Sequence, residues 1–419
     1  MEQIKIRDDK NKVMKYYTHQ LSNGLRIIHV ENKSDVAHCG LIINAGSRDE
    51  EKHEQGIAHF IEHLIFKGTH KRKAFHILSR MDNVGGDINA YTSKEETCIH
   101  TSFIQNEYSR ALELLSDLAF SSTFPGKEIE KEKEVIIDEI NSYKDNPSEL
   151  IFDDFEELVF AGQPIGRNIL GSPETLNKFS KEDFINFVRK NYLPDQMVIS
   201  SIGNIPFSKL VQMIEKYFNQ YQPHPIQKTR TPFKNYRPEN KVIENNTTQA
   251  HCMIGNIGYD MYDPRRTTLS LLENIIGGPG LTSRLNMLLR EKLGYVYHVE
   301  SNFTPFTDTG VFSVYFATDK NKLEKALTQV KKEFRRLREN KLGSVQLRNA
   351  KKQLFGQIAI QSESNANMML ANGKSFLFRN ELNSLDQIKE KIDAIHSENV
   401  IEVANEILNP GHLSILIYQ

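Results

Sequence analysis

The chain carries the segment FINFVRKNYLPDQMVISSIG (184–203) and, about 215 residues later, NVIEVANEILNPGHLSILIY (399–418). Each has a helix-like apolar period, a turn containing proline, and a final apolar run typical of a strand. A second pair, TCIHTSFIQNEYSRALELLSDLAF (97–120) and VFSVYFATDKNKLEKALTQVKKEF (311–334), has the order strand, turn, amphipathic helix at nearly the same offset. Two matches in the same order predict two similar halves.

The boundary between these halves is visible in the composition. The stretch YQPHPIQKTRTPFKNYRPEN (221–240) contains four prolines and little apolar periodicity, which is typical of an exposed linker. We therefore expect an N-terminal domain (1–220), a linker (221–240) and a C-terminal domain (241–419). Strands come in runs before long amphipathic helices, which favours an α+β fold. Each domain is predicted to be a mostly antiparallel sheet with helices packed on one face.

Composition is ordinary for a globular protein of 419 residues, with 39% hydrophobic and 26% charged residues. A formal net charge of -1 gives no reason to expect nucleic acid or an anionic membrane as a partner. Cys39, Cys98 and Cys252 form no metal-binding pair, and their odd number argues against a disulfide framework. The first residues lack the apolar stretch of a secretory signal, so we expect a soluble, cytoplasmic protein.

The segment HEQGIAHFIEHLIFKGT (53–69) carries the main chemical signal of the chain. Its apolar residues recur at helical spacing, and positions i and i+4 of a helix lie on one face. His59 and His63 are therefore able to bind one ion, while Glu62 projects beside the same face without being a ligand. Two histidines on a helix followed by a distant third ligand are typical of a catalytic zinc site, which keeps one position for water.

A third ligand has to come from elsewhere in the chain. IEKEKEVIIDEINSY (129–143) is predicted to be a second helix, on which Glu132 and Glu139 are seven residues apart and share a face. Glu139 would complete a His2Glu site. Glu132 would lie behind the ligands and orient one of them.

These histidines and glutamates also have interpretations that involve no metal. Two histidines on a buried helix are sometimes core residues with satisfied hydrogen bonds, although an unligated His-Glu-His cluster is costly to bury. Glutamates on helices are mostly solvated, so Glu132 and Glu139 prove little by themselves. We take the remaining histidines near the motif, His53, His70 and His76, as surface residues.

With these residues in place, the sequence resembles the inverzincins, the H-x-x-E-H class, and within them the pitrilysin, insulinase and mitochondrial processing peptidase family. His59, Glu62 and His63 match the motif of that family, Glu139 matches its third zinc ligand, and Glu132 matches a further glutamate. The resemblance extends over nearly the whole chain and implies one Zn2+ per chain. It also implies a short, two-domain member of the bacterial type.

The resemblance also implies how a peptide substrate is held. The stretch GGDINAYT (85–92) is similar to the substrate-carrying strand of the family, which implies binding by Asn89, Ala90, Tyr91 and Thr92. GGPGLTSRLNMLLREKLGYVYHVES (277–301) is similar to its C-terminal signature. There Arg290 and Tyr297 match the substrate-contacting arginine and tyrosine, and Tyr295 is a rival for the tyrosine because some members place it directly after the glycine.

Short members of the family usually dimerise to build a chamber from four domains, so we expect a homodimer that closes around its substrate. The offset between the halves supports a division of roles. Adding it to His59, Glu62, His63 and Glu139 leads to four residues that are not zinc ligands: Asn274, Gly277, Gly278 and Leu354. The C-terminal domain is therefore predicted to lack a metal site.

The expected function is a zinc-dependent endopeptidase that cleaves peptides or unfolded segments inside a closed chamber. Glu62 would activate a zinc-bound water as general base, with Arg290, Tyr297 and Glu132 assisting. The alternative is a non-catalytic or partner-dependent assembly subunit of a peptidase complex, because the family includes members that have lost their ligands. The physiological substrate stays open at this point.

Overall fold

The computed structural model of the protein describes residues 16–222, 229–245 and 247–419. Part of the expected linker, 223–228, lies outside these residues. The chain forms two compact units, and each is assembled from several segments. Unit 1 contains the chain up to Ile140, Arg167–Arg230 and Ile360–Ser384, and unit 2 contains Asn141–Gly166, Thr231–Ala359 and Leu385–Gln419. The expected division at 221–240 separates the two repeated halves and stays a prediction. The compact units are divided differently, because each contains a segment from both halves of the chain.

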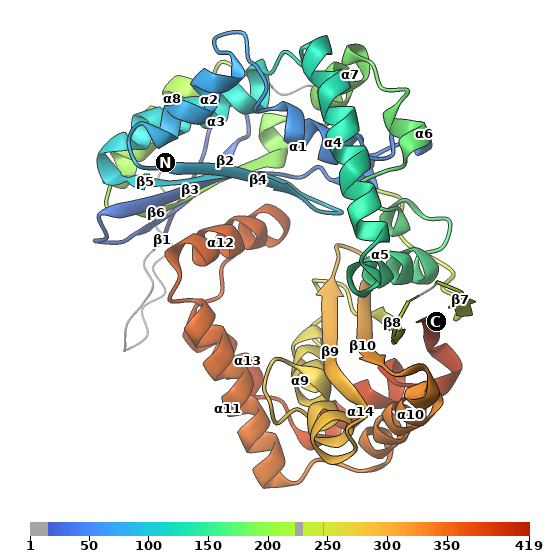
Figure 1. Ribbon diagram of the computed structural model, residues 1–419. Helices are drawn as coiled ribbons and strands as arrows, with labels where there is room; N and C mark the ends of the chain where they lie inside the picture. Colours follow the sequence, from blue (N-terminus) through green and yellow to red (C-terminus); the bar gives the residue numbers. More distant parts are fainter. Residues whose placement is uncertain (1–15, 223–228, 246) are drawn as a thin grey trace. The chain divides into compact units, whose positions relative to one another are not determined.

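Unit 1 is built on a six-stranded sheet with the strand order β1-β2-β6-β3-β5-β4 (Figure 1). Its strands are β1 (Tyr16–Gln20), β2 (Arg26–Glu31), β3 (Val36–Ile43), β4 (Asp87–Thr92), β5 (Thr97–Ile104) and β6 (Met197–Gly203). β2 and β6 pair in parallel, and the other neighbours pair antiparallel. The two edge strands are therefore β1 and β4.

Helices cover both faces of the sheet of unit 1. On one face, shown above the sheet in Figure 1, lie α1 (Ile57–Leu64), α2 (Ala74–Asp82), α3 (Tyr108–Ser121), α7 (Lys181–Asn191) and α8 (Phe207–Phe218). α4 (Gly126–Lys144) begins in unit 1, and the short α6 (Pro173–Leu176) precedes α7. On the other face lies α12 (Asn365–Arg379), whose Phe376 and Leu377 pack with Ile42 and Cys98 of the strands. Helices were expected on one face of each sheet, and in unit 1 α12 covers the other face as well.

Unit 2 has a five-stranded sheet with the order β7-β11-β8-β10-β9. The strands are β7 (Asn240–Ile243), β8 (Ala250–Gly258), β9 (Val296–Pro305), β10 (Gly310–Thr318) and β11 (Ser414–Tyr418), with β7 and β11 parallel. One face packs on α9 (Arg266–Gly277), α10 (Leu323–Glu339), α11 (Ser344–Gln361), α13 (Leu385–Asp393) and α14 (Ser397–Ile407). The other face packs on α5 (Pro147–Val159) through Ile151 and Phe155.

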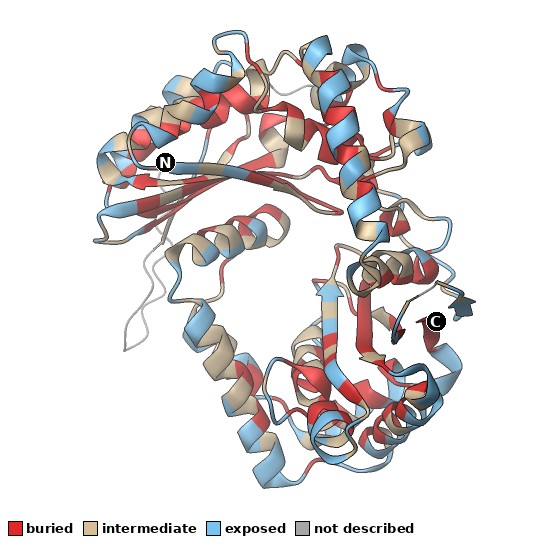
Figure 2. Ribbon diagram, in the orientation of Figure 1, coloured by how far each residue is buried: buried red, intermediate tan, exposed pale blue. Residues whose placement is uncertain are grey.

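The topology confirms the α+β class and the two similar units. Reading β2, β6, β3, β5 and β4 of unit 1 against β7, β11, β8, β10 and β9 of unit 2 gives the same neighbours and the same single parallel pair. Each of the four repeated segments seen in the sequence forms the expected strand and helix. Figure 2 shows that buried residues concentrate in the strands and on the helix faces turned toward them.

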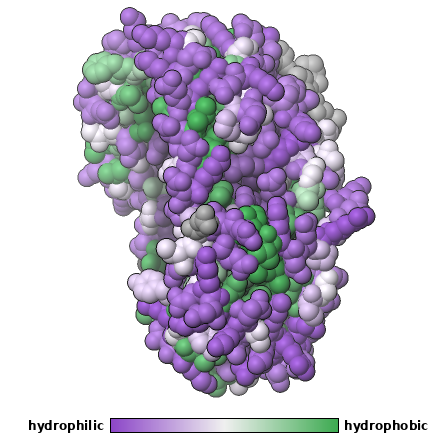
Figure 3. Space-filling view, turned by 45° about the vertical axis from the view of Figure 1, so that its right-hand side comes forward, coloured by the Kyte–Doolittle hydropathy of each residue, from purple (hydrophilic) through white to green (hydrophobic). Residues whose placement is uncertain are grey.

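Figure 3 shows one face of the chain, which is mostly hydrophilic with apolar residues gathered in a few patches. None of the described helices has both the length and the apolarity required to cross a bilayer. The three cysteines are buried and unpaired.

Candidate metal centre

Helix α1 is anchored at its N-terminus by a buried carboxylate. Glu50, which is 3% exposed, accepts hydrogen bonds from the backbone N–H of Gly56 (3.0 Å) and of Ala58 (3.0 Å). Burial raises the pKa of Glu50 well above its usual value, although these hydrogen bonds act in the opposite direction. Gly56 has a φ of 95°, and a side chain there would meet the backbone of Gly171. The start of α1 is therefore fixed just before its first histidine.

The two histidines of α1 and Glu139 of α4 converge on one point. The Oε2 atom of Glu139 lies 3.8 Å from Nε2 of His59 and 3.7 Å from Nε2 of His63. Tetrahedral ligands about 2 Å from a zinc ion lie roughly 3.3 Å apart, so this spacing suits one small cation. Among the described residues, these three form the one group of histidine, cysteine and carboxylate side chains close enough to share a metal ion.

The protonation state of His59 also suits a cation. Burial, with a smaller effect from His63, lowers the pKa of His59 to about 3. His59 is thus neutral at physiological pH, which is the form that binds a metal. The donor atoms of the three side chains point at one another, and a cation between them would accept their electron pairs. The residues present therefore fit a zinc ion.

Glu132 lies behind His63. Its side chain is 8% exposed, and Oε2 accepts a hydrogen bond from Nδ1 of His63 at 3.1 Å. In the neutral imidazole this bond holds the proton on Nδ1, so that Nε2, which faces Glu139, has a free electron pair. The other oxygen of Glu132 pairs with Nζ of Lys67 at 2.8 Å. Sequence reasoning missed Lys67, which lies after the end of α1, and no spacing in the sequence pointed to its contact with Glu132.

Glu62 lies beside the triad and is partly buried. Burial raises its pKa, while hydrogen bonding by Thr92 of β4 acts in the opposite direction. Glu62 is close enough to Glu139 for the second carboxylate to raise its pKa further. The arrangement places a proton acceptor next to the predicted metal position without making it a ligand.

The predicted substrate strand is the outer strand of its sheet. β4 pairs with β5 on one side and ends the strand order on the other. Asn89 is exposed, Ala90 is buried, and Tyr91 and Thr92 are partly buried. An edge strand presents backbone N–H and C=O groups to an added strand.

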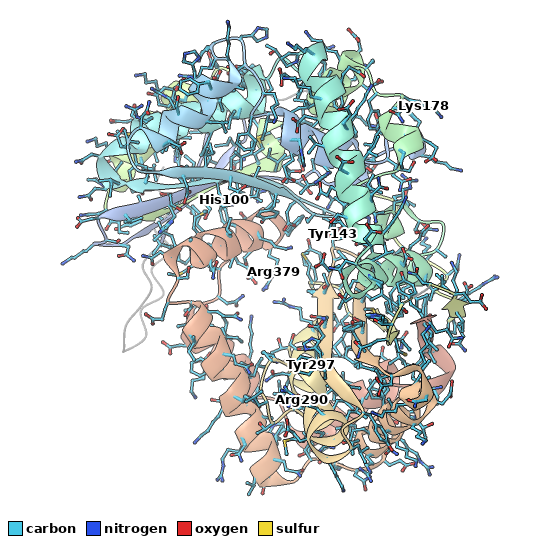
Figure 4. All side chains as sticks on the ribbon, in the orientation of Figure 1. His100, Tyr143, Lys178, Arg290, Tyr297 and Arg379 are labelled. Atoms are coloured by element: carbon cyan, nitrogen blue, oxygen red, sulfur yellow. The ribbon has the colours of Figure 1, made fainter. Side chains whose placement is uncertain are left out.

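The arginine and tyrosine predicted for the second half lie together in unit 2. Arg290 belongs to the π-helical segment Asn286–Lys292, and its guanidinium lies 5.4 Å from the ring centre of Tyr297 on β9 (Figure 4). Tyr297 is 81% exposed, whereas Tyr295 packs against the core of unit 2. The metal triad belongs to unit 1, so the structure of either unit alone does not bring the two sets together.

Comparison with known proteins places both halves of the chain in one family. A family model described as insulinase (peptidase family M16) matches residues 26–173, and one described as the peptidase M16 inactive domain matches 178–354. The chain belongs to peptidase family M16. An uncharacterized zinc protease of Bacillus subtilis is 33% identical to this M16 chain, over 97% of it and 98% of the relative.

Two further comparisons extend this relation. The beta subunit of the mitochondrial-processing peptidase of Saccharomyces cerevisiae is 29% identical to the M16 chain, over 93% of it and 87% of the subunit. The crystal structure of a protease from Helicobacter pylori superimposes with a TM-score of 0.90 at 20% identity, over 97% of this chain and all of that one. The M16 chain therefore has the two-domain fold of its relatives.

Proposed function

We propose that this chain is a zinc-dependent endopeptidase, in which His59, His63 and Glu139 hold the metal and Glu62 is the catalytic base. The observation that carries the proposal is the convergence of three donor groups, from two separate helices, beside a second carboxylate, Glu62. The relatives named zinc proteases support the choice of metal and reaction.

The chemistry expected of the site divides between metal and protein. A bound zinc ion would polarise the scissile carbonyl and acidify a water molecule. Glu62 would take the proton from the attacking water and later pass it to the leaving amine. Its partial burial, which favours the protonated carboxyl, suits a group that has to carry a proton between these two steps. Glu132, tied to Lys67, would keep His63 in the tautomer that binds metal.

The substrate proposed is an extended peptide. The open edge of β4 would pair with the backbone of a substrate, which favours unfolded segments with loose sequence preference. Arg290 and Tyr297 would donate hydrogen bonds to substrate carbonyls, and the exposure of Tyr297 supports it over Tyr295 for this role. We propose further that the chain acts as a homodimer and that cleavage takes place in a closed chamber.

The alternative function is a non-catalytic or partner-dependent assembly subunit. Such a subunit would have no need for a complete ligand set, a base beside it and a carboxylate behind a ligand. The retention of these groups in one place favours the catalytic function.

The experiment that tests the proposed function uses the purified full chain and a mixture of unstructured peptides. Cleavage should occur, stop when a chelator removes the metal, and return when about one equivalent of zinc per chain is added. Cleavage that continues after the metal has been removed would exclude zinc chemistry. A fully zinc-loaded protein that cleaves none of the peptides would favour the assembly subunit.

A second measurement tests the substrate class and the chamber. One cleavable sequence is presented as a free peptide and again inside a stably folded domain. The free peptide should be cut and the folded copy spared, because exposing an unpaired backbone in a folded domain costs stability. Equal rates for the two would indicate an open groove.

A further inference from the structure

Unit 1 contains a pocket that none of the triad residues lines. It has a volume of about 670 Å3 and lies between the segment before α4, helix α7 and the chain that follows α8. Pockets that bind small molecules in proteins usually measure about 300–1,000 Å3. The size of this pocket therefore suits a small organic molecule.

The interior of the pocket is aromatic and aliphatic. Phe120 and Tyr221 stack on each other with ring centres 4.0 Å apart, and Ile185 and Val188 of α7 face the same space. Phe124 is 2% exposed and Tyr192 is 5% exposed. These side chains form an apolar surface onto which a ring or chain of a ligand would pack.

The rim of the pocket is cationic. Lys181 and Arg189, both on α7, are exposed lining residues, and no described residue forms an ion pair or hydrogen bond with either side chain. The next residue along, Lys190, points elsewhere and pairs with Glu51 at 3.0 Å. Among the described residues that line the pocket there is no carboxylate. An anionic group at the rim would therefore meet two cations that have no competing partner.

The pocket is connected to both helices that carry the triad through residues that lie before α4 and against α1. Phe124 directly precedes Pro125 and α4, and its φ of 46° is unusual for an aromatic residue. Its ring lies 5.7 Å from that of Phe184, which lies 4.9 Å from the ring of Phe60 on α1, the neighbour of His59. A ligand that moves Phe124 would therefore press on α1 and on the start of α4.

A backbone connection joins the same two regions. Thr123, which lines the pocket, donates hydrogen bonds from its N–H (3.0 Å) and from its Oγ1 (3.2 Å) to the carbonyl of Gly68. The N–H of His70 donates to the carbonyl of Ser121 at 2.9 Å. The chain after α1 is thus tied to the chain before α4, next to the pocket. A shift of this connection would move α1 relative to the start of α4, and with them the two histidines relative to Glu139.

We propose that this pocket binds an organic anion with an aromatic or aliphatic body, and that its occupancy changes the metal affinity of the triad. The ligand class follows from an apolar interior beneath two free cations. The coupling rests on the proposed metal site, whereas the binding of the anion does not.

Binding is tested with 8-anilinonaphthalene-1-sulfonate, which has an aromatic body, one sulfonate and a fluorescence that rises in apolar surroundings. The full chain should bind one molecule per chain with saturation. The double substitution Lys181→Met and Arg189→Met should weaken binding at least about tenfold, because it removes both charge-assisted contacts. Lys190→Met is the matched control and should bind like the wild type.

A neutral probe separates charge from packing. N-phenyl-1-naphthylamine has the same aromatic body without the sulfonate, and its affinity should be equal in the wild type and the double variant. Sulfonate binding that the double variant retains at full strength would overturn the assignment, as would an equal loss of both probes.

The coupling is tested by measuring the sulfonate dissociation constant in the zinc-loaded and the chelator-treated protein. The two constants should differ at least about threefold, and the zinc affinity measured against a chromophoric chelator should shift by the same factor when the sulfonate is present, as linkage requires. Equal constants would overturn the coupling. A chain that binds no zinc would refute the proposed metal site and the coupling with it, while the anion site is judged by the first measurement alone.

Discussion

Helices α1 and α9 occupy the same place in the two units and differ in what they present. Each packs against the outer strand of its sheet, α1 on β4 and α9 on β9. Where α1 has His59 and His63, the repeat offset leads to Asn274 and Gly278. Asn274 is 2% exposed, and a side chain at Gly278 would overlap it and the backbone of α9. At this place in unit 2, the described residues offer no pair of ligands, and close packing leaves no space for a side chain at Gly278.

The residue of unit 2 that corresponds to the third ligand is also a packing residue. The offset leads from Glu139 to Leu354, which is 9% exposed and belongs to the core of unit 2. Glu139 is 34% exposed at its side chain and faces two imidazoles. One architecture thus supports either a metal site or a packed core at the same position, and the local side chains decide which.

The largest expected effect comes from removing the base in α1. Glu62→Gln keeps the volume of the side chain but removes its ability to accept a proton. Peptide turnover should fall about 10²–10⁴-fold, the usual contribution of a general base, while zinc content stays near one per chain. Steady-state kinetics and elemental analysis measure the two quantities. Glu273→Gln, the same change at a glutamate of α9, is a control and should leave turnover near that of the wild type.

The second effect concerns the ligand supplied by α4. Glu139→Gln should lower zinc affinity more than about 100-fold. Loss of a residue that only hydrogen-bonds a ligand already costs about 10–100-fold, and this change replaces a charged ligand itself. Zinc content after dialysis against a weak chelator measures this. Glu134→Gln, an exposed change on the same helix, is the control. Full zinc occupancy in the Glu139 variant would remove it as a ligand.

The third effect contrasts buried titratable groups in the two units. Burial raises the pKa of Glu273 in unit 2 to about 7, and it lowers the pKa of His29 in unit 1 to about 4. The folded state therefore binds the proton of Glu273 more tightly than the unfolded state does, so this group stabilises unit 2 as the pH falls from 7 toward 4.5. His29 has the opposite sign and costs stability as the pH falls from 6.5 toward 4.

Each of these two pKa shifts changes the free energy of unfolding by at most about 3 kcal/mol. Glu273→Gln should raise the thermal midpoint of the transition that reports on unit 2 at pH 8, and should match the wild type near pH 5. His29→Gln should lose less stability than the wild type between pH 7 and pH 5. Calorimetric scans at several pH values measure both, and gaps that do not change with pH would contradict the assignment of these two groups.

The smallest expected effect comes from the packing at Gly278, the residue that follows α9. Gly278→Ala should destabilise unit 2 by about 1–3 kcal/mol, because its Cβ would meet the backbone of Asn274 as well as its side chain. A fall in the thermal midpoint of a few degrees would report it. Gly126→Ala at the start of α4 has open space around it and should be nearly neutral. A neutral Gly278 variant would mean that α9 tolerates side chains at this place.

The comparison of α1 with α9 also shows which features of the site were predictable from the sequence. The pairing of His59 with His63, the position of Glu62 and the repeat of strand and helix were all predictable, because they depend on spacing within a single helix or on patterns within single segments. Glu139 and Glu132 were predicted from a shared helical face, but their approach to α1 depends on how α4 packs. The contact of Lys67 with Glu132 joins residues 65 positions apart and had no pattern of its own.

The sequence by itself determined the local geometry of the motif and the α+β class with two similar halves, since backbone periodicity decides these over a few turns or strands. Only the tertiary structure decided which segments complete each unit. Helix α12 comes from the second half of the chain yet packs on the sheet of unit 1, where Gly373 fits against Ile42 and Arg26 donates hydrogen bonds to the carbonyls of Phe376 and Leu377. Such a fit depends on the shapes of two surfaces far apart in the chain, and no spacing within either segment encodes it.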